Sequence, residues 1–226
     1  MLEKIYIYGD SIMKATVPDE DFHYHFHLNQ VMQPYEDLPV EIVNRAKMGA
    51  TVTKGQSLLE HDLERGLDAR YALLAFGGND CDFDWSAVAA EPEKEHLPHT
   101  DLPHFLQTLT SMVERLKQQG IQPVLMTLPP IDAGKYLDFI CRDGLSKDKI
   151  LSWLGDCQMI YRFQEMYSDA VGKLADKLQL PLLDVRTEFL GNHNFWRMNA
   201  RDGIHLTDEG YQFLFSHLVG SLAGAL

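Results

Sequence analysis

Short runs of apolar and β-branched residues recur along the chain, and most of them end at glycine, proline or asparagine. In these runs apolar side chains occupy both sides of the alternation, which is typical of parallel strands that are buried on both faces. We predict five strands, at residues 4–8, 40–44, 71–76, 122–128 and 182–185.

Between the strands, apolar residues recur at every third or fourth position, as on one face of a helix. The clearest case follows Thr100 and Asp101, either of which could be the N-cap, and it stops at Gly120. Strands that alternate with helices form βαβ units, so the predicted fold class is α/β: a three-layer α/β/α sandwich with a central parallel sheet of about five strands. We predict helices at residues 56–65, 102–119, 160–178 and 208–222.

Two segments, residues 81–99 and 133–156, do not fit this alternation. Each follows the carboxyl end of a predicted strand, which is the edge where open α/β sheets bind ligands. They are either loop insertions that shape a substrate pocket or surface decoration. The chain has no repeat and no low-complexity linker, so we expect residues 1–226 to form a single domain.

The charge and the cysteines narrow the class of protein. Lys and Arg number 20 against 33 Asp and Glu, a formal net charge of −13, so nucleic acid and anionic membrane are poor partners. The first residues do not resemble a signal peptide, and no apolar run reaches the length of a membrane span. The 3 cysteines have no metal-like spacing. We therefore expect a cytoplasmic protein without stable membrane association; its oligomeric state stays open.

Two polar motifs lie near opposite ends of the chain. Gly9-Asp10-Ser11 directly follows the first predicted strand, which places a serine hydroxyl at the sheet edge. Asp202 precedes His205 by three residues, and a turn of that length can bring the carboxylate to the imidazole while the other ring nitrogen deprotonates a serine. Each motif alone is also common turn chemistry. The Gly-x-Ser-x-Gly elbow of other α/β hydrolases is absent.

Two further residues could complete such a site. Asn79 lies in a Gly-Gly-Asn-Asp sequence after the third predicted strand, and Gly49 lies in the loop after the second. An amide and a backbone N–H directed into one crevice could form an oxyanion hole, in which each donor stabilises the transition state by about 3 kcal/mol.

Taken in this order, the motifs resemble the SGNH hydrolase superfamily, often called the GDSL esterase/lipase family, and the match runs from residue 9 to residue 205. The resemblance implies a flavodoxin-like SGNH hydrolase fold. It implies Ser11 as nucleophile, His205 as general base and Asp202 as the residue that orients His205. It also implies an oxyanion hole made by the Ser11 and Gly49 N–H groups and the Asn79 amide.

The activity implied by this resemblance is that of a serine esterase that works through an acyl-enzyme, without a metal or an organic cofactor. The expected substrate is a small acyl ester, such as an O-acetyl or short-chain ester of a carbohydrate or metabolite. A lysophospholipase or thioesterase on the same machinery is the alternative within enzymes. A non-catalytic binding module that keeps the fold is the alternative outside them.

Residues 22–27 place three histidines at alternate positions. On a strand they would share one face, and on a helix His23 and His27 would be neighbours, and either arrangement could suggest a metal site. No second cluster of Cys or His accompanies them, so we predict an amphipathic helix with surface imidazoles and no metal site.

Acidic and aromatic residues near the predicted site are candidates for substrate binding. Asp80, Asp82 and Asp84 follow Asn79 and would either make the crevice anionic or lie in a solvated loop. Tryptophan faces stack on sugar rings, although packing is the more common role. The substrate-binding candidates are Asp10, Asp80, Trp85 and Trp196.

Overall fold

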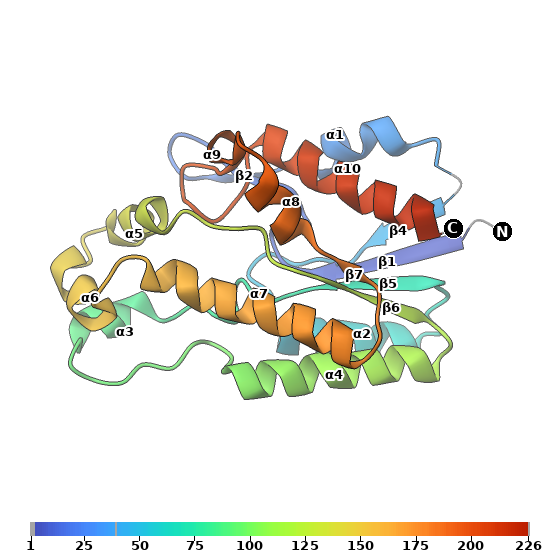
Figure 1. The fold of residues 1–226 in the computed structure, drawn as a ribbon, viewed down its shortest axis with the longest axis horizontal. Helices are drawn as coiled ribbons and strands as arrows, with labels where there is room; N and C mark the ends of the chain where they lie inside the picture. Colours follow the sequence, from blue (N-terminus) through green and yellow to red (C-terminus); the bar gives the residue numbers. More distant parts are fainter. Residues whose placement is uncertain (1–2, 39, 226) are drawn as a thin grey trace.

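In the computed structural model, which describes residues 3–38 and 40–225, five parallel strands form the central sheet in the order β4–β1–β5–β6–β7 (Figure 1). The predicted α/β fold with its parallel sheet is confirmed, although three strands end earlier than predicted. The five strands are β1 (Glu3–Gly9), β4 (Val40–Asn44), β5 (Tyr71–Ala75), β6 (Gln122–Met126) and β7 (Leu182–Leu183).

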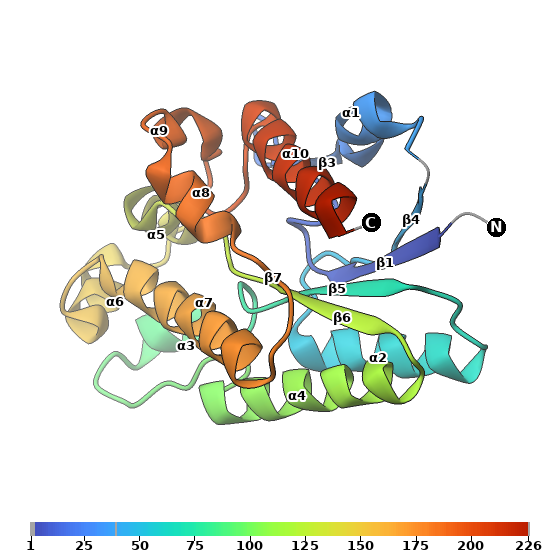
Figure 2. The ribbon, with the colours of Figure 1, turned by 45° about the vertical axis from the view of Figure 1, so that its right-hand side comes forward.

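Helices cover both faces of this sheet, as Figure 2 shows. The helices on one face are α2 (Val52–Glu64), α4 (Leu102–Gln118) and α7 (Met159–Lys177). Those on the other face are α1 (Leu28–Met32), α8 (Val185–Gly191) and α10 (Asp208–Ala225). Two short helices complete this side, η1 (Gln33–Tyr35) and α9 (Phe195–Met198). None of the helices in the described part of the chain is both long and apolar enough to cross a membrane.

The alternation along β1 explains why its residues are apolar on both sides. Ile5 and Ile7 pack with Phe215 of α10, whereas Tyr8 packs with Phe105 of α4 in the opposite layer. All three β1 side chains are fully buried. The apolar run therefore contributes to two separate cores.

A third apolar cluster lies beyond the carboxyl edge of the sheet, built by α3 (Trp85–Ala90), α5 (Ala133–Cys141), α6 (Lys147–Leu154) and the first residues of α7 (Figure 1). It occupies the two segments that we expected to be loop insertions. Residues 133–156 are in fact mostly helical. Side chains that accept hydrogen bonds from first-turn N–H groups start the three helices, at Asp84, Asp132 and Ser146.

The predicted amphipathic helix at residues 22–27 is wrong. The segment forms an antiparallel hairpin in which β2 (Thr16–Pro18) pairs with β3 (Tyr24–Phe26). The Asp19 carboxylate accepts two backbone hydrogen bonds in the connecting turn, and Phe22 takes a positive φ of 61° there. These local bonds compete with a helix, and the period-two alternation suits a strand.

The strand order sets the position of the site. The chain goes from β1 to β4 on one side of β1, and then to β5 on the other side. Ligands bind at such a reversal, beyond the carboxyl ends of the strands. The chain is closely packed here. A Cβ on Gly9 would lie 2.8 Å from Met13 Cγ and 3.0 Å from the Ala75 carbonyl oxygen. Only glycine fits this position without a shift.

Candidate active site

Ser11 lies in the turn that follows β1. Its carbonyl oxygen accepts hydrogen bonds from the N–H groups of Lys14 and Thr16, both at 3.2 Å. These bonds fold the chain back at the sheet edge and fix the position of the serine. The residue is 8% exposed, so its hydroxyl is largely shielded from bulk water.

Asp202 and His205 come together in the turn before α10. Asp202 Oδ1 accepts hydrogen bonds from the N–H groups of Ile204 (3.1 Å) and His205 (3.0 Å). Its other oxygen, Oδ2, lies 2.6 Å from His205 Nδ1, and His205 Nε2 lies 2.8 Å from Ser11 Oγ. The three side chains thus form a continuous chain of hydrogen bonds, although Ser11 and His205 lie 194 positions apart in the sequence.

Electrostatics keep the Asp202 carboxylate ionised. Its burial disfavours the charge, but the hydrogen bond and the charge of His205, with the two backbone N–H groups, outweigh that cost and lower the pKa of Asp202. An ionised carboxylate at Nδ1 can stabilise an imidazolium and fix the tautomer of His205. The ring of Tyr24, on the hairpin, packs 5.1 Å from the imidazole, centroid to centroid.

Asn79, after β5, points its amide nitrogen into the same edge. Nδ2 donates to the Ala50 carbonyl oxygen at 3.1 Å and to Asp10 Oδ2 at 3.3 Å. An oxyanion would therefore have to replace one of these two acceptors. Gly49 takes a φ of +68°, is exposed, and is not one of the residues that line the cavity beside Ser11. A role for its N–H in the oxyanion hole stays a prediction.

Asp10 is a second buried carboxylate at this edge, 6% exposed. Its Oδ1 accepts a hydrogen bond from the Ile12 N–H at 2.9 Å. Burial raises the pKa of Asp10 to about 6, although the Ile12 bond and the charge of His205 oppose the rise. Its ionisation therefore changes near pH 6.

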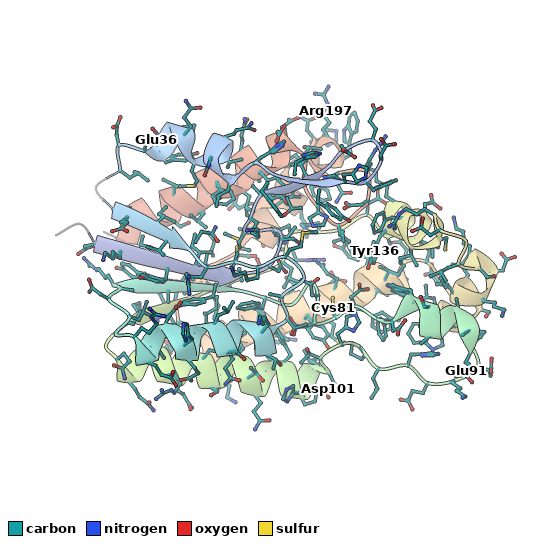
Figure 3. The ribbon with its side chains drawn as sticks, turned by 180° about the vertical axis from the view of Figure 1, so that it is seen from behind. Glu36, Cys81, Glu91, Asp101, Tyr136 and Arg197 are labelled. Atoms are coloured by element: carbon teal, nitrogen blue, oxygen red, sulfur yellow. The ribbon has the colours of Figure 1, made fainter. Side chains whose placement is uncertain are left out.

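A cavity of about 90 Å³ opens from Ser11 and His205 toward the third apolar cluster. Cys81, which follows β5, and Tyr136 of α5, both labelled in Figure 3, lie in its wall. Pockets for drug-sized ligands span about 300–1,000 Å³, so this one suits a small group. Its apolar lining consists mainly of Phe76, Phe83, Trp85, Leu128, Ile131, Tyr136, Ile160, Phe163 and Ile204.

The four substrate-binding candidates have different positions. Asp10 and Trp85 line the cavity. Asp80 does not, because it is fully buried and both its oxygens accept from the Val52 N–H (3.0 and 3.2 Å) at the start of α2. Trp196 is 68% exposed in a separate groove. Asp80 thus supports the start of α2, and Trp196 lies outside the cavity beside Ser11.

The sequence indicates Asp82 only as one of three acidic residues near the crevice, and it gives no sign that Tyr136 lines the cavity. The Tyr136 hydroxyl donates to Asp82 Oδ2 at 2.5 Å across 54 residues of chain. The only signal was the alternation of Asp80, Asp82 and Asp84, in which the middle residue points to the cavity and the last one caps α3. In the part of the chain that the structure describes, no group of three His, Cys, Asp or Glu side chains could hold a metal ion.

The fold is an α/β/α sandwich in which serine, histidine and aspartate side chains meet at the carboxyl edge of the sheet. This combination is typical of a class of hydrolases. The chain belongs to the GDSL-like lipase/acylhydrolase family, whose model matches residues 7–213. This match confirms the resemblance to the SGNH/GDSL hydrolases, and it makes the protein a member of a family of esterases and acylhydrolases.

Relatives and solved structures agree with this assignment. The chain is 24% identical over 224 residues to the isoamyl acetate-hydrolyzing esterase of Saccharomyces cerevisiae, covering 96% of this chain and 84% of that protein. It is 27% identical to the human isoamyl acetate-hydrolyzing esterase 1 homolog over 184 residues, covering 79% of this chain and 66% of that protein.

Two crystal structures show the same fold. A lipase/acylhydrolase from Enterococcus faecalis superposes with a TM-score of 0.64 at 19% identity, covering 99% of this chain and 97% of that chain. An acetylxylan esterase from Geobacillus stearothermophilus superposes with a TM-score of 0.65 at 18% identity, covering 97% and 94%. At these identities the likeness concerns the fold.

Proposed function

We propose that this protein is a serine esterase that hydrolyses a small acyl ester through an acyl-enzyme on Ser11. The observation that carries the proposal is the pair of short contacts at His205, 2.8 Å from Nε2 to Ser11 Oγ and 2.6 Å from Nδ1 to Asp202 Oδ2. This geometry lets one ring nitrogen take a proton while the other is held by a carboxylate.

In the first half of the proposed reaction, Ser11 Oγ attacks the ester carbonyl carbon and its proton passes to His205 Nε2. The carbonyl oxygen becomes an oxyanion, for which the Asn79 amide and backbone N–H groups are the proposed donors. The tetrahedral intermediate then collapses, the C–O bond to the alcohol breaks, and the alcohol leaves with the proton from His205. Ser11 now carries the acyl group.

In the second half, water takes the place of the alcohol. His205 removes a proton from this water as it attacks the acyl carbon of the Ser11 ester. Collapse of the second intermediate releases the carboxylic acid, and Ser11 recovers its proton from His205. The sum is one ester and one water converted to one acid and one alcohol, with no other reactant.

The cavity favours a compact substrate over a carbohydrate. A sugar ring would need several polar partners, whereas the lining is mostly aromatic and aliphatic. Two of the relatives are named for isoamyl acetate, an acetyl ester of a short branched alcohol. We therefore propose an acetyl or short-chain ester of a small metabolite. A lysophospholipase role is less favoured, since no Lys or Arg is among the lining residues to meet a phosphate.

The test compares wild type, Ser11→Ala and Ser57→Ala, where Ser57 is an exposed serine on α2. We expect a fluorophosphonate probe to label wild type and Ser57→Ala but not Ser11→Ala. Hydrolysis of p-nitrophenyl acetate should show a burst in the labelled proteins and fall by about 10⁴-fold or more in Ser11→Ala. Equal labelling and equal rates in wild type and Ser11→Ala would overturn the proposal.

A further inference from the structure

One carboxylate in the cavity wall has no part in the proposed reaction. Asp82 lines the cavity, and its oxygens are held by donors from two different helices. The Tyr136 hydroxyl of α5 donates to Oδ2 at 2.5 Å, and the Trp85 indole N–H of α3 donates to Oδ1 at 2.8 Å. These two bonds fix the position of the carboxylate. Asp82 is partly exposed and is one of the residues that line the cavity.

The Asp82 carboxylate has no close counter-ion among the described residues. Burial raises its pKa, although the bonds from Tyr136 and Trp85 and the charge of His99 oppose the rise. Among the described residues, Asp82 takes part in no ion pair within 4.0 Å. The cavity lining contains a second carboxylate, Asp10, and one imidazole, His205, but no Lys or Arg. The Tyr136 and Trp85 bonds solvate the carboxylate, but neither supplies a positive charge in contact with it.

The walls around Asp82 are aromatic. Phe83, Trp85, Tyr136 and Phe163 all line the cavity. They pack against one another through tilted and edge contacts, with centroid distances of 5.6 Å for Phe83–Trp85 and 6.4 Å for Trp85–Tyr136. Aromatic rings carry negative charge on their faces and attract cations, most strongly where water is excluded.

An apolar group in this cavity would displace water from Asp82 and leave a charge buried without compensation, which is costly. An anionic group would add repulsion from two carboxylates. A group with a positive charge would meet both the carboxylate and the aromatic rings, and it would offset the cost of burial.

We propose that the cavity binds an ester that carries a protonated amine on the group that enters the cavity, either the alcohol or the acyl group. This amine contacts Asp82 and the surrounding aromatic rings. The inference rests on the proposed esterase function and names the substrate class of the same site. Asp82 then determines which ester binds, whereas Ser11 and His205 perform the reaction.

The test uses three acetates of nearly equal size that differ in charge. They are 3-methylbutyl acetate (neutral), 2-(dimethylamino)ethyl acetate (cationic at pH 7) and 3-acetoxypropanoate (anionic). A second pair places the charge on the acyl side, with ethyl 4-methylpentanoate against ethyl 3-(dimethylamino)propanoate. The value of kcat/KM is measured for each ester with wild type, Asp82→Asn and Asp84→Asn. Asp84 gives the control, because it loses the same charge two residues away but outside the cavity, and Asn also caps a helix.

We expect wild type to prefer the cation to its neutral isostere in at least one pair and to hydrolyse the anion most slowly. Asp82→Asn should lower the cation-to-neutral ratio of kcat/KM at least tenfold, whereas Asp84→Asn should leave it unchanged. Differences in intrinsic ester reactivity cancel, because the same ratio is compared between variants. A ratio that is the same in wild type and Asp82→Asn for both pairs would overturn the proposal.

A measurement on wild type alone covers the case in which Asp82→Asn does not fold. The hydrolysis products of both pairs are compared as competitive inhibitors: 2-(dimethylamino)ethanol against 3-methylbutan-1-ol, and 3-(dimethylamino)propanoate against 4-methylpentanoate. In at least one pair the amine should bind at least tenfold more tightly. Equal inhibition constants in both pairs would contradict the inference while hydrolysis itself continues. Failure of the proposed function looks different, since wild type would then neither react with the fluorophosphonate nor hydrolyse any of the esters.

Discussion

Two regions of this molecule meet at the cavity, and they are built in different ways. The sheet edge carries Ser11, Asp202 and His205, whose polar atoms are joined by hydrogen bonds to one another and to nearby backbone N–H groups. The wall is an aromatic cluster on three short helices, with Asp82 as the carboxylate that connects α3 to α5. In the proposed function, the edge carries the groups that break the ester bond, and the wall carries the groups that select the substrate.

The edge positions its side chains more rigidly than the wall does. The edge groups follow strand ends or precede a long helix, so a rigid scaffold sets their separation. The wall helices contact mainly one another, as α3 and α6 do, and extend beyond the sheet. Substitutions in the wall can thus alter substrate choice without moving Ser11 or His205.

The two regions touch at Gly203, in the turn between Asp202 and His205. A Cβ there would lie 2.5 Å from the Asp132 carbonyl oxygen and 2.5 Å from the Tyr136 nitrogen. The Asp132 N–H also donates to the Gly203 carbonyl oxygen at 2.8 Å. Close approach at this glycine joins the start of α5 to the histidine turn, and it fixes the wall in relation to the reacting groups.

Asp202→Asn should have the largest effect on the edge while it leaves the wall intact. The amide oxygen can keep the bonds from Ile204 and His205 N–H, but the amide NH₂ would face His205 Nδ1 and favour the tautomer that cannot accept the serine proton. We expect kcat to fall by about 10⁴-fold. Steady-state rates with 3-methylbutyl acetate and its cationic isostere provide the measurement.

The control for this variant is the ratio between the two esters. If edge and wall act separately, that ratio stays as in wild type even though both rates collapse. A loss of less than about tenfold in kcat, in a protein that folds normally by circular dichroism, would show that Asp202 does not orient His205.

Asn79→Ala should have the next largest effect. The amide is the proposed side-chain donor to the oxyanion, an interaction that forms in the transition state and not with the bound ester. We expect kcat to fall by about 10²–10³-fold with little change in KM. A raised KM with unchanged kcat would instead place Asn79 in ground-state binding. Unchanged kcat and unchanged KM would leave its bonds to Ala50 and Asp10 as its main role.

Much of the edge could be predicted from the sequence, because its signals are local. A serine directly after a buried strand and a carboxylate three residues before a histidine are placed by short turns. The long helices were likewise readable from their apolar spacing, although α2 begins at Val52, four residues earlier than predicted. That early start depends on the Asp80 carboxylate, a contact 28 residues away that no local pattern indicates.

The wall could not be predicted in the same way, because its contacts join distant parts of the chain. Asp80, Asp82 and Asp84 are equivalent in sequence, yet one supports a helix, one lines the cavity and one is an exposed cap. Local sequence patterns do not predict the hairpin at residues 16–26, for a related reason. Its histidines fit a helix or a strand equally well, and the turn at Asp19 decides between them.

Asp10 lies at the border of the two regions, so its ionisation gives the smallest but most discriminating prediction. Its pKa is about 6 in the folded protein, against 3.8 for an ordinary aspartate. Between these values the unfolded chain has released a proton that the folded chain still holds. Folding is therefore favoured at low pH, and stability declines as the pH rises through about 6.

Asp10→Asn removes this titration. The free energy of unfolding of the variant, relative to wild type, should rise by up to about 3 kcal/mol between pH 4 and pH 8, as measured by urea denaturation at each pH. Any pH-independent cost of losing the Asn79 bond cancels in that comparison. Asp37→Asn, at an exposed position, should run parallel to wild type. Parallel curves for Asp10→Asn as well would mean that water reaches Asp10 from the cavity and relieves its burial. The border between edge and wall would then be wet, and a cationic substrate would gain less from the carboxylates around it.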